Sequence, residues 1–166
     1  MPIAQALLPE FDHEMAGTRT VLERIPEAKV GFRPHPKSWT LGELGLHLAN
    51  LPTWATLTLT RPELDLAPPG GPPFTSPKFE SAAASVRLLD KNVAKARTLI
   101  AGATDADLMT MWSLKNAGAT VFTLPRLAVL RSMVLSHMIH HRGQLTVYLR
   151  MCDVPLPPIY GSTADT

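Results

Sequence analysis

The sequence contains a single cysteine, Cys152, among its 166 residues. A lone cysteine excludes an internal disulfide, and in an apolar segment we expect it to be a buried small hydrophobe rather than a nucleophile. Long apolar runs are also missing, since no window approaches the roughly 20 continuous apolar residues that a membrane span requires. The N-terminal segment lacks the basic region, apolar run and cleavage site of a secretion signal. We therefore expect a cytoplasmic protein.

The sequence has little excess of charge of either sign. Its formal net charge is only +2 at pH 7, and basic residues are interleaved with acidic ones. Four arginines do fall in one late segment, at Arg126, Arg131, Arg142 and Arg150. No aromatic residues alternate with them to provide stacking platforms for bases, so we expect these arginines on a solvated helix face. The composition therefore argues against a nucleic-acid-binding protein.

The spacing of apolar residues predicts a helical protein. The length is sufficient for one domain with its own core, spanning residues 1–166. Apolar residues recur at intervals of three and four in four segments, at roughly residues 3–25, 41–60, 80–101 and 125–151. The prolines that follow predict an extended tail over residues 153–166. We therefore expect an all-α fold, a four-helix bundle.

Local signals refine these segments. Thr40 and Glu43 form a capping-box pattern that starts the second helix, and Pro52 is expected to kink that helix rather than end it. The proline- and glycine-rich residues 61–78 form a linker that is long enough to cross the bundle, so the second and third helices can run parallel. Residues 104–123 include ATVFTL, which could be a short strand; we interpret the whole segment as an irregular connection.

Three of the six histidines lie within the stretch HMIHHRGQL, residues 137–145. At about 100° per residue, His137 and His141 fall on one line of the fourth helix and point toward the core. His47 lies on the inward face of the second helix and can meet them there. His140 lies roughly 60° to one side, so we expect it at the rim of any site or beside a ligand.

The convergence of three histidines favours a metal site over ordinary core packing. Each buried imidazole needs hydrogen-bond partners, and every missing partner costs about 1 to 3 kcal/mol, whereas one divalent cation satisfies three nitrogens at once. The HxxxH spacing lets two rings on one helix reach the same ion. The alternative is that each histidine is a hydrogen-bonded core residue with no metal at all.

Three segments resemble the DinB/YfiT-like superfamily of metal-binding four-helix bundles: FDHEMAGTRTVLERIP, PHPKSWTLGELGLHLANLPTW and HMIHHRGQLTVYLRMCDVPLPPIYG. The resemblance implies an up-down-down-up order of helices, with a long crossover between helices two and three. It also implies that His47, His137 and His141 bind a divalent metal, commonly nickel or zinc, and that the protein forms homodimers. His35 lies in the second segment, which approaches the site in the resemblance, but as a lone loop histidine it is expected to be exposed.

Three histidine ligands leave at least one coordination position open, which is typical of catalytic rather than structural metal sites. The glutamate that follows the first histidine in HExxH is missing, so we do not predict proteolysis. Gln144 is a candidate for orienting bound water or substrate, or for capping a buried polar group. Glu14 is a candidate base or ligand-orienting residue, or else a solvated glutamate. Candidates for a pocket mouth, or for plain core packing, are Trp39, Trp54 and Tyr160.

The back of the fourth helix carries a second stripe of small and apolar residues. Its members are Ala128, Ser132, Leu135, Ile139, Gly143 and Thr146. The stripe either forms the interface of a homodimer or packs against residues 104–123 or the tail.

These observations predict a divalent-metal-binding protein with one of two classes of function. In the first class it is a metal-dependent enzyme, and the resemblance implies a low-molecular-weight thiol S-transferase or a hydrolase, whose substrates are a small-molecule thiol and an electrophile or another small molecule. In the second class the bundle binds metal without turnover, as a stress-response or scaffold protein. A solvent path to the open coordination position distinguishes the two classes.

Overall fold

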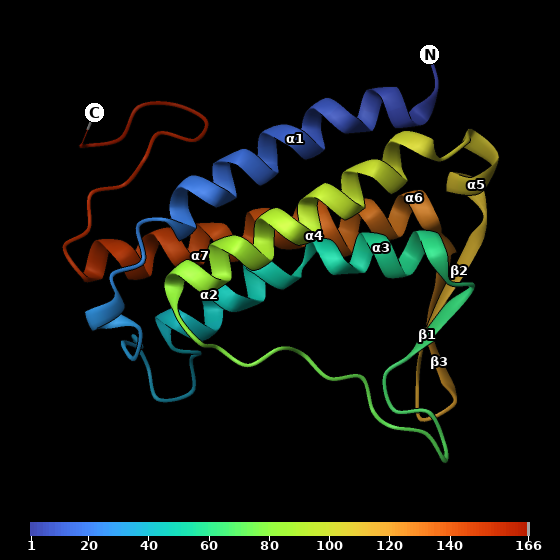
Figure 1. The fold of residues 1–166 in the computed structure, drawn as a ribbon, viewed down its shortest axis with the longest axis horizontal. Coiled ribbons are helices and arrows are strands. Elements are labelled where there is room, and N and C mark those ends of the chain that lie inside the picture. The colour runs from blue at the N-terminus through green and yellow to red at the C-terminus, as the bar shows by residue number, and fades with distance from the viewer. Residues whose placement is uncertain (166) are drawn as a thin grey trace.

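Four long helical segments make up most of the chain in the computed structural model, which describes residues 1–165 (Figure 1). The segments are α1 (Ile3–Leu22), α2 (Leu41–Asn50) followed by α3 (Pro52–Thr60), α4 (Ala82–Gly102), and α6 (Arg126–Val129) followed by the π-helical η2 (Leu130–Ser136) and α7 (His137–Met151). A short 3₁₀ turn, η1 (Glu27–Lys29), follows α1. The molecule is therefore mostly helical, as the sequence predicted.

The four segments run along the long axis of the molecule (Figure 1). In that view α1 runs from right to left, and the α2–α3 segment returns from left to right. The chain then crosses back through residues 61–81, so that α4 again runs from left to right. The last segment, from α6 through α7, runs from right to left. The α2–α3 segment and α4 therefore point the same way, which requires a connection as long as the bundle.

A small sheet lies at one end of the bundle, and the prediction of an all-α fold is wrong in this respect (Figure 1). Its strands, in the order β1-β2-β3, are β1 (Glu63–Asp65), β2 (Met111–Asn116) and β3 (Ala119–Pro125). β1 pairs with β2 in parallel, whereas β2 and β3 form an antiparallel hairpin. A short helix, α5 (Asp105–Met109), precedes the hairpin.

The predicted irregular connection over residues 104–123 is therefore wrong, and the local sequence shows why a hairpin forms there. Trp112 is fully buried and Leu114 is 6% exposed, while the residues between and after them face outward, which is the period-two pattern of a strand. Ala117 and Gly118 both have positive φ, of 51° and 80°. A two-residue hairpin turn of this hand requires positive φ at both central positions, and glycine adopts it without strain.

The helix boundaries differ from the predicted ones in detail. The first helix ends at Leu22, about one turn before the predicted residue 25. The chain stays helical through Leu51, with φ of −54° and ψ of −39°, so Pro52 removes one backbone donor without ending the helical segment. The fourth segment is not the uniform α-helix that we expected, because η2 within it is π-helical.

The buried apolar side chains form two clusters. The larger cluster lies between the helical segments and includes Phe11, Leu48, Leu89 and Leu149, each at most 1% exposed. The smaller cluster joins the sheet to α3 and α6 through Leu57, Leu64, Trp112, Leu114 and Val129. Cys152 is buried with a free thiol, as expected of a structural cysteine. Among residues 1–165, no helix combines the length and apolar character needed to cross a membrane.

Candidate metal centre

The structure brings the three predicted metal ligands together. His137 and His141 lie one turn apart on α7, and His47 lies on α2, which packs against α7. The Nε2 atoms of His141 and His137 are 2.9 Å apart, and those of His47 and His137 are 3.4 Å apart. Their candidate ligand atoms all lie within 4.8 Å of one another, and no other group of three or more histidine, cysteine, aspartate or glutamate side chains within residues 1–165 converges in this way.

A hydrogen bond made by a ring nitrogen that faces away from the cluster indicates which nitrogen carries the proton and which keeps its lone pair. His141 Nδ1 lies 2.7 Å from Oε1 of Gln144, and because this oxygen only accepts, Nδ1 carries the ring proton. Nε2 of His141 therefore presents a lone pair toward Nε2 of His137, 2.9 Å away, and Nε2 of His47 lies 3.4 Å from the same atom. Burial lowers the pKa of His137 by more than a hydrogen bond with the backbone of Met133 raises it. Three imidazole nitrogens that converge in this way are suitable ligands for one divalent cation, so the donor set fits a metal ion.

The π-helical segment η2 supplies the partner of His137. In a regular α-helix the backbone N–H of His137 would bond to the carbonyl of Met133, but here it bonds to the carbonyl of Val134. The carbonyl of Met133 is then available to the imidazole ring of His137. π-Helical segments occur often at functional sites, and this one ends directly before the ligand candidate His137.

The three histidines are uncharged at neutral pH. Burial lowers the pKa of His47 to about 4, with a further contribution from the positive charges that His141 and His137 can carry. Burial is also the main cause that lowers the pKa of His137 and of His141 below the ordinary value of 6.5. Neutral imidazole is the form that binds metals, so the environment prepares all three rings as ligands.

Aromatic rings border the cluster on the solvent side. The ring centroid of Trp39 lies 4.8 Å from that of His47 and 5.5 Å from that of His141, and Trp39 is 44% exposed. His140 is exposed, and its ring centroid lies 4.9 Å from that of His141. The three ligand rings are themselves only half-buried. The three rings are therefore partly accessible to solvent, next to the exposed Trp39 and His140.

Glu14 does not lie at the histidine cluster. Its carboxylate forms an ion pair with Arg142 and accepts a hydrogen bond from Tyr160. Tyr160, a candidate for a pocket mouth, is therefore hydrogen bonded to Glu14. Arg142 is only 2% exposed, so the prediction of a solvated face is wrong for this arginine. The sequence did not predict this burial, because helical spacing does not distinguish a buried arginine from an exposed one.

The two remaining candidates are engaged elsewhere. Trp54 packs between the two apolar clusters, with its ring centroid 6.2 Å from that of Phe74. His35 is exposed in its loop, as expected, and its Nδ1 accepts a hydrogen bond of 3.1 Å from the backbone N–H of Lys37.

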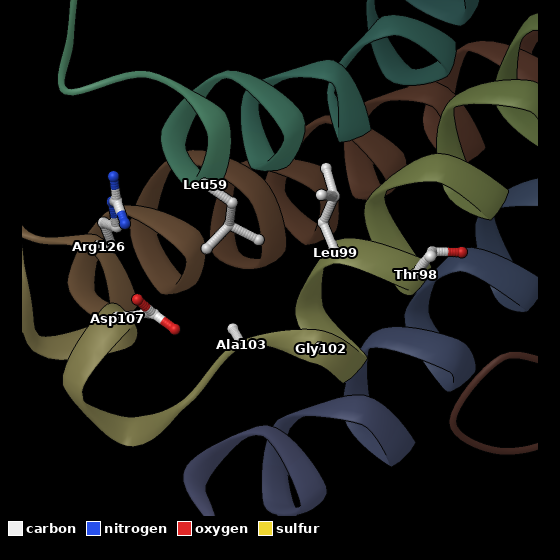
Figure 2. Close-up of a pocket in the computed structure, with 7 residues that line it drawn as sticks. All are labelled: Leu59, Thr98, Leu99, Gly102, Ala103, Asp107 and Arg126. Atoms are coloured by element: carbon white, nitrogen blue, oxygen red, sulfur yellow. The ribbon is translucent and has the colours of Figure 1, made fainter.

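A cavity lies away from the histidines, between the ends of α3 and α4 and the short helices α5 and α6 (Figure 2). Its volume is about 290 Å³, and its lining residues are Leu59, Thr98, Leu99, Gly102, Ala103, Asp107 and Arg126. None of the three histidines lines it. The candidate centre is therefore defined by the convergence of ring nitrogens and not by this cavity.

Comparison with protein families gives one match. A family model described as the DinB superfamily matches residues 10–145, which is most of the chain. A search of curated proteins gave no match.

Solved structures of DinB-like proteins share the fold. A DinB-like protein from Bacillus cereus is 23% identical, with a TM-score of 0.72 over 96% of this chain and 98% of that one. The DinB-like protein YjoA from Bacillus subtilis is 18% identical, with a TM-score of 0.69 over 95% of this chain and 99% of that one. YfiT from Bacillus subtilis is 16% identical, with a TM-score of 0.65 over 90% of this chain and 87% of that one. YfiT is described as a probable metal-dependent hydrolase with an unusual four-helix bundle topology.

Proposed function

Because this chain belongs to the DinB superfamily, we propose that it is a metal-dependent protein of up-down-down-up bundle order whose His47, His137 and His141 hold one divalent ion. The observation that carries the proposal is the convergence of the three ring nitrogens, with Nε2 of His141 and Nε2 of His137 2.9 Å apart. Nickel and zinc are the ions we propose, since imidazole nitrogen suits both.

The open side of the cluster favours an enzyme over a closed structural site. When bound, a divalent ion with three histidine ligands can lower the pKa of water to about 7 or hold a thiol as its thiolate. Gln144 and the carbonyl of Met133 fix the orientation of two ligand rings. Trp39 offers an aromatic face to a substrate, and His140 can accept a proton at the rim.

Transfer of a low-molecular-weight thiol to an electrophile is the reaction we propose first. A thiolate needs no general base once it has formed, and among residues 1–165 no carboxylate joins the histidine cluster. The thiol sulfur bonds to the electrophilic carbon, and the leaving group departs with the electron pair of its bond. The thiol proton passes to His140 or to solvent. The substrates of this reaction are a small-molecule thiol and a small electrophile.

Hydrolysis is the second candidate, and the description of YfiT as a probable metal-dependent hydrolase favours it. Hydrolysis needs a group that accepts the proton of the attacking water. Because Glu14 is paired with Arg142, His140 is the side chain that we propose as the acceptor of this proton. An activity that depends on added thiol distinguishes the first reaction from the second.

We further propose a cytoplasmic homodimer. Low-molecular-weight thiols stay reduced in the cytoplasm, which suits the first reaction. Ile139 and Gly143 are exposed on the back of α7 and can contribute to an interface, whereas Leu135 of the same stripe is 2% exposed and already belongs to the core. Light scattering on the purified protein measures the oligomeric state.

Elemental analysis of the protein, purified without an affinity tag, tests the metal proposal. We expect about one equivalent of nickel or zinc in the parent and little in a His137→Ala variant. Absence of metal in both, together with a parent whose stability does not respond to chelation, would mean that the histidines are core residues.

An activity assay on the metal-loaded protein then distinguishes an enzyme from a non-catalytic stress-response or scaffold protein. Cysteine or glutathione is mixed with an aryl halide, and release of the halide is followed with the parent and with His137→Ala. Turnover that requires both the metal and the thiol supports the transferase. Metal binding without turnover of thiol or ester substrates would favour the non-catalytic alternative.

A further inference from the structure

A buried ion pair involves Arg142, the residue that follows His141 on α7, and the proposed chemistry does not use it. Arg142 is 2% exposed, and Glu14 on α1 is 5% exposed. Nη2 of Arg142 pairs with Oε2 of Glu14, and Nη1 donates to the backbone carbonyl of Glu14 at 2.9 Å. Nη1 also lies 3.3 Å from Oγ1 of Thr18. The guanidinium of Arg142 on α7 is therefore bound to both the side chain and the backbone of Glu14 on α1.

The C-terminal tail completes this contact. The hydroxyl of Tyr160 accepts from Nη2 of Arg142 and donates to Oε2 of Glu14 at 2.7 Å, and its ring lies 5.2 Å from the guanidinium carbon. Gly17 makes room for this arrangement, since a Cβ there would lie 3.1 Å from Nη1 of Arg142 and 3.3 Å from the side chain of Ile159. One polar contact therefore joins α1, α7 and the tail.

Stability alone does not account for such a pair. The desolvation of two buried charges offsets much of their attraction, and apolar residues of similar volume often hold a core equally well. A guanidinium fork does have a property that apolar contacts lack, which is direction: it meets a carboxylate in a narrow range of geometries. A directional contact fixes the rotation of a helix about its own axis.

The rotation of α7 decides where its two histidines point. Arg142 directly follows His141, so the ion pair acts on the same helical turn as the ligands. Side-chain tips lie about 6 Å from a helix axis, so a rotation of about 5° moves them by about 0.5 Å. Metal–ligand distances tolerate only about 0.2 Å. Because His47 sits on a different helix, a small rotation of α7 spoils the match between the three rings.

We propose that Arg142 and Glu14 are positioning residues for the three-histidine site. Their ion pair sets the rotation of α7 and, through it, the placement of His137 and His141 against His47. The hydroxyl of Tyr160 couples the docking of the tail to this placement. This inference rests on the proposed metal-binding function.

The test replaces the pair by apolar residues of similar size, in Glu14→Leu/Arg142→Met, so that no unpaired charge stays buried. The matched control is Asp12→Leu/Arg97→Met, which removes the exposed ion pair between α1 and α4. Cobalt(II) is titrated into each folded, metal-free protein, and both the Kd and the visible absorption spectrum are recorded. We expect the Kd of the Glu14/Arg142 variant to rise at least about tenfold and its spectrum to change, with an unfolding midpoint close to that of the parent. The control should match the parent in all three.

One result would overturn the positioning role of the ion pair, and another would overturn the metal function. An unchanged Kd and spectrum in the folded Glu14/Arg142 variant would show that the pair has no positioning role. A parent that binds no cobalt would overturn the metal function itself.

A variant that keeps both charges covers the case in which the double variant does not fold. In Gly17→Ala the added methyl group presses on Nη1 of Arg142 without removing any partner. We expect a rise in Kd of about threefold with a shifted cobalt spectrum, because the guanidinium must move by a few tenths of an ångström. An unchanged Kd and spectrum in a folded Gly17→Ala protein would overturn the inference.

Discussion

Two polar clusters share helix α7, and their hydrogen bonding differs in kind. The arginine cluster consists of Glu14, Arg142 and Tyr160, and the histidine cluster consists of His47, His137 and His141. In the arginine cluster the donors meet acceptors, although Glu14 and Arg142 are more deeply buried than the three histidines. In the histidine cluster the inner ring nitrogens meet one another. Burial of polar groups therefore does not distinguish the two clusters in kind, whereas the convergence of three ring nitrogens does.

The largest predicted effect comes from breaking the complete cluster. In Arg142→Ala the carboxylate of Glu14 stays buried without its counter-ion. We expect the free energy of unfolding to fall by about 3 to 5 kcal/mol, because an uncompensated buried charge is costly. Urea unfolding measures this change.

Arg97→Ala is the control for this prediction, since Arg97 pairs with Asp12 on the exposed face of the bundle. We expect little change in that variant, because solvent screens the pair. An Arg142→Ala protein no less stable than Arg97→Ala would mean that water reaches Glu14, and the contrast between the two clusters would then disappear.

Removing a member of the histidine cluster should act through the metal. Zinc or nickel at about 100 times its Kd is expected to raise the free energy of unfolding of the parent by about 2.7 kcal/mol. In His47→Leu we expect this gain to vanish, while the metal-free protein keeps a stability close to that of the parent. Thermal unfolding with and without metal measures both quantities. His35→Leu, in an exposed loop, is the control that should keep the full response to metal.

Local signals place each of the three histidines on its helix, and the family resemblance joins His47 to the pair on α7, which lies 90 residues away. Helical spacing aligns His137 with His141, and the capping box of Thr40 and Glu43 sets the start of the helix that carries His47. The structure contains that capping box, with Oγ1 of Thr40 accepting from the backbone N–H of Glu43. Local rules of this kind depend on few neighbours, so they hold before the tertiary fold is known.

The features that the sequence did not predict depend on contacts between distant segments. The strand β1 pairs with β2 about fifty residues later in the chain, and β2 is stabilised by burying Trp112 and Leu114 against the bundle. The burial of Arg142 depends on Glu14, which lies 128 residues away. The π-helical segment η2 has no sequence signature, because it reflects how the helix fits its neighbours. Helical periodicity contains none of this information.

Gln144→Leu sharpens the comparison, because it removes the hydrogen-bond partner of one ligand while leaving all three histidines in place. Without Oε1 of Gln144, Nδ1 of His141 loses its acceptor and the ring loses its fixed orientation. We expect the metal Kd to rise by about 10- to 100-fold, as is usual for residues that orient a ligand. Isothermal titration with zinc measures it. Gln5→Leu, on the exposed face of α1, should bind like the parent, and a Gln144→Leu protein with the parent's Kd would contradict the assigned ring tautomer.

The smallest effect is expected for a third set of charges, Asp165 in the tail with Arg150 on α7. Its hydrogen bonding is complete, but the pair lies close to solvent. Side-chain hydrogen bonds from Arg150, together with the backbone N–H of Leu156, lower the pKa of Asp165 to about 2 from an ordinary value of 3.8. A pKa that is lower in the folded state gives stability that is fully present above pH 3.8 and is lost as the pH falls through about 2. We therefore expect Asp165→Asn to change the unfolding midpoint at pH 7 only slightly, and 1 M salt to bring the pKa of Asp165 toward 3.8, as measured by carboxyl NMR titration. If Asp165→Asn instead destabilised the protein as much as Arg142→Ala, complete hydrogen bonding and not burial would account for the large effect at the arginine cluster.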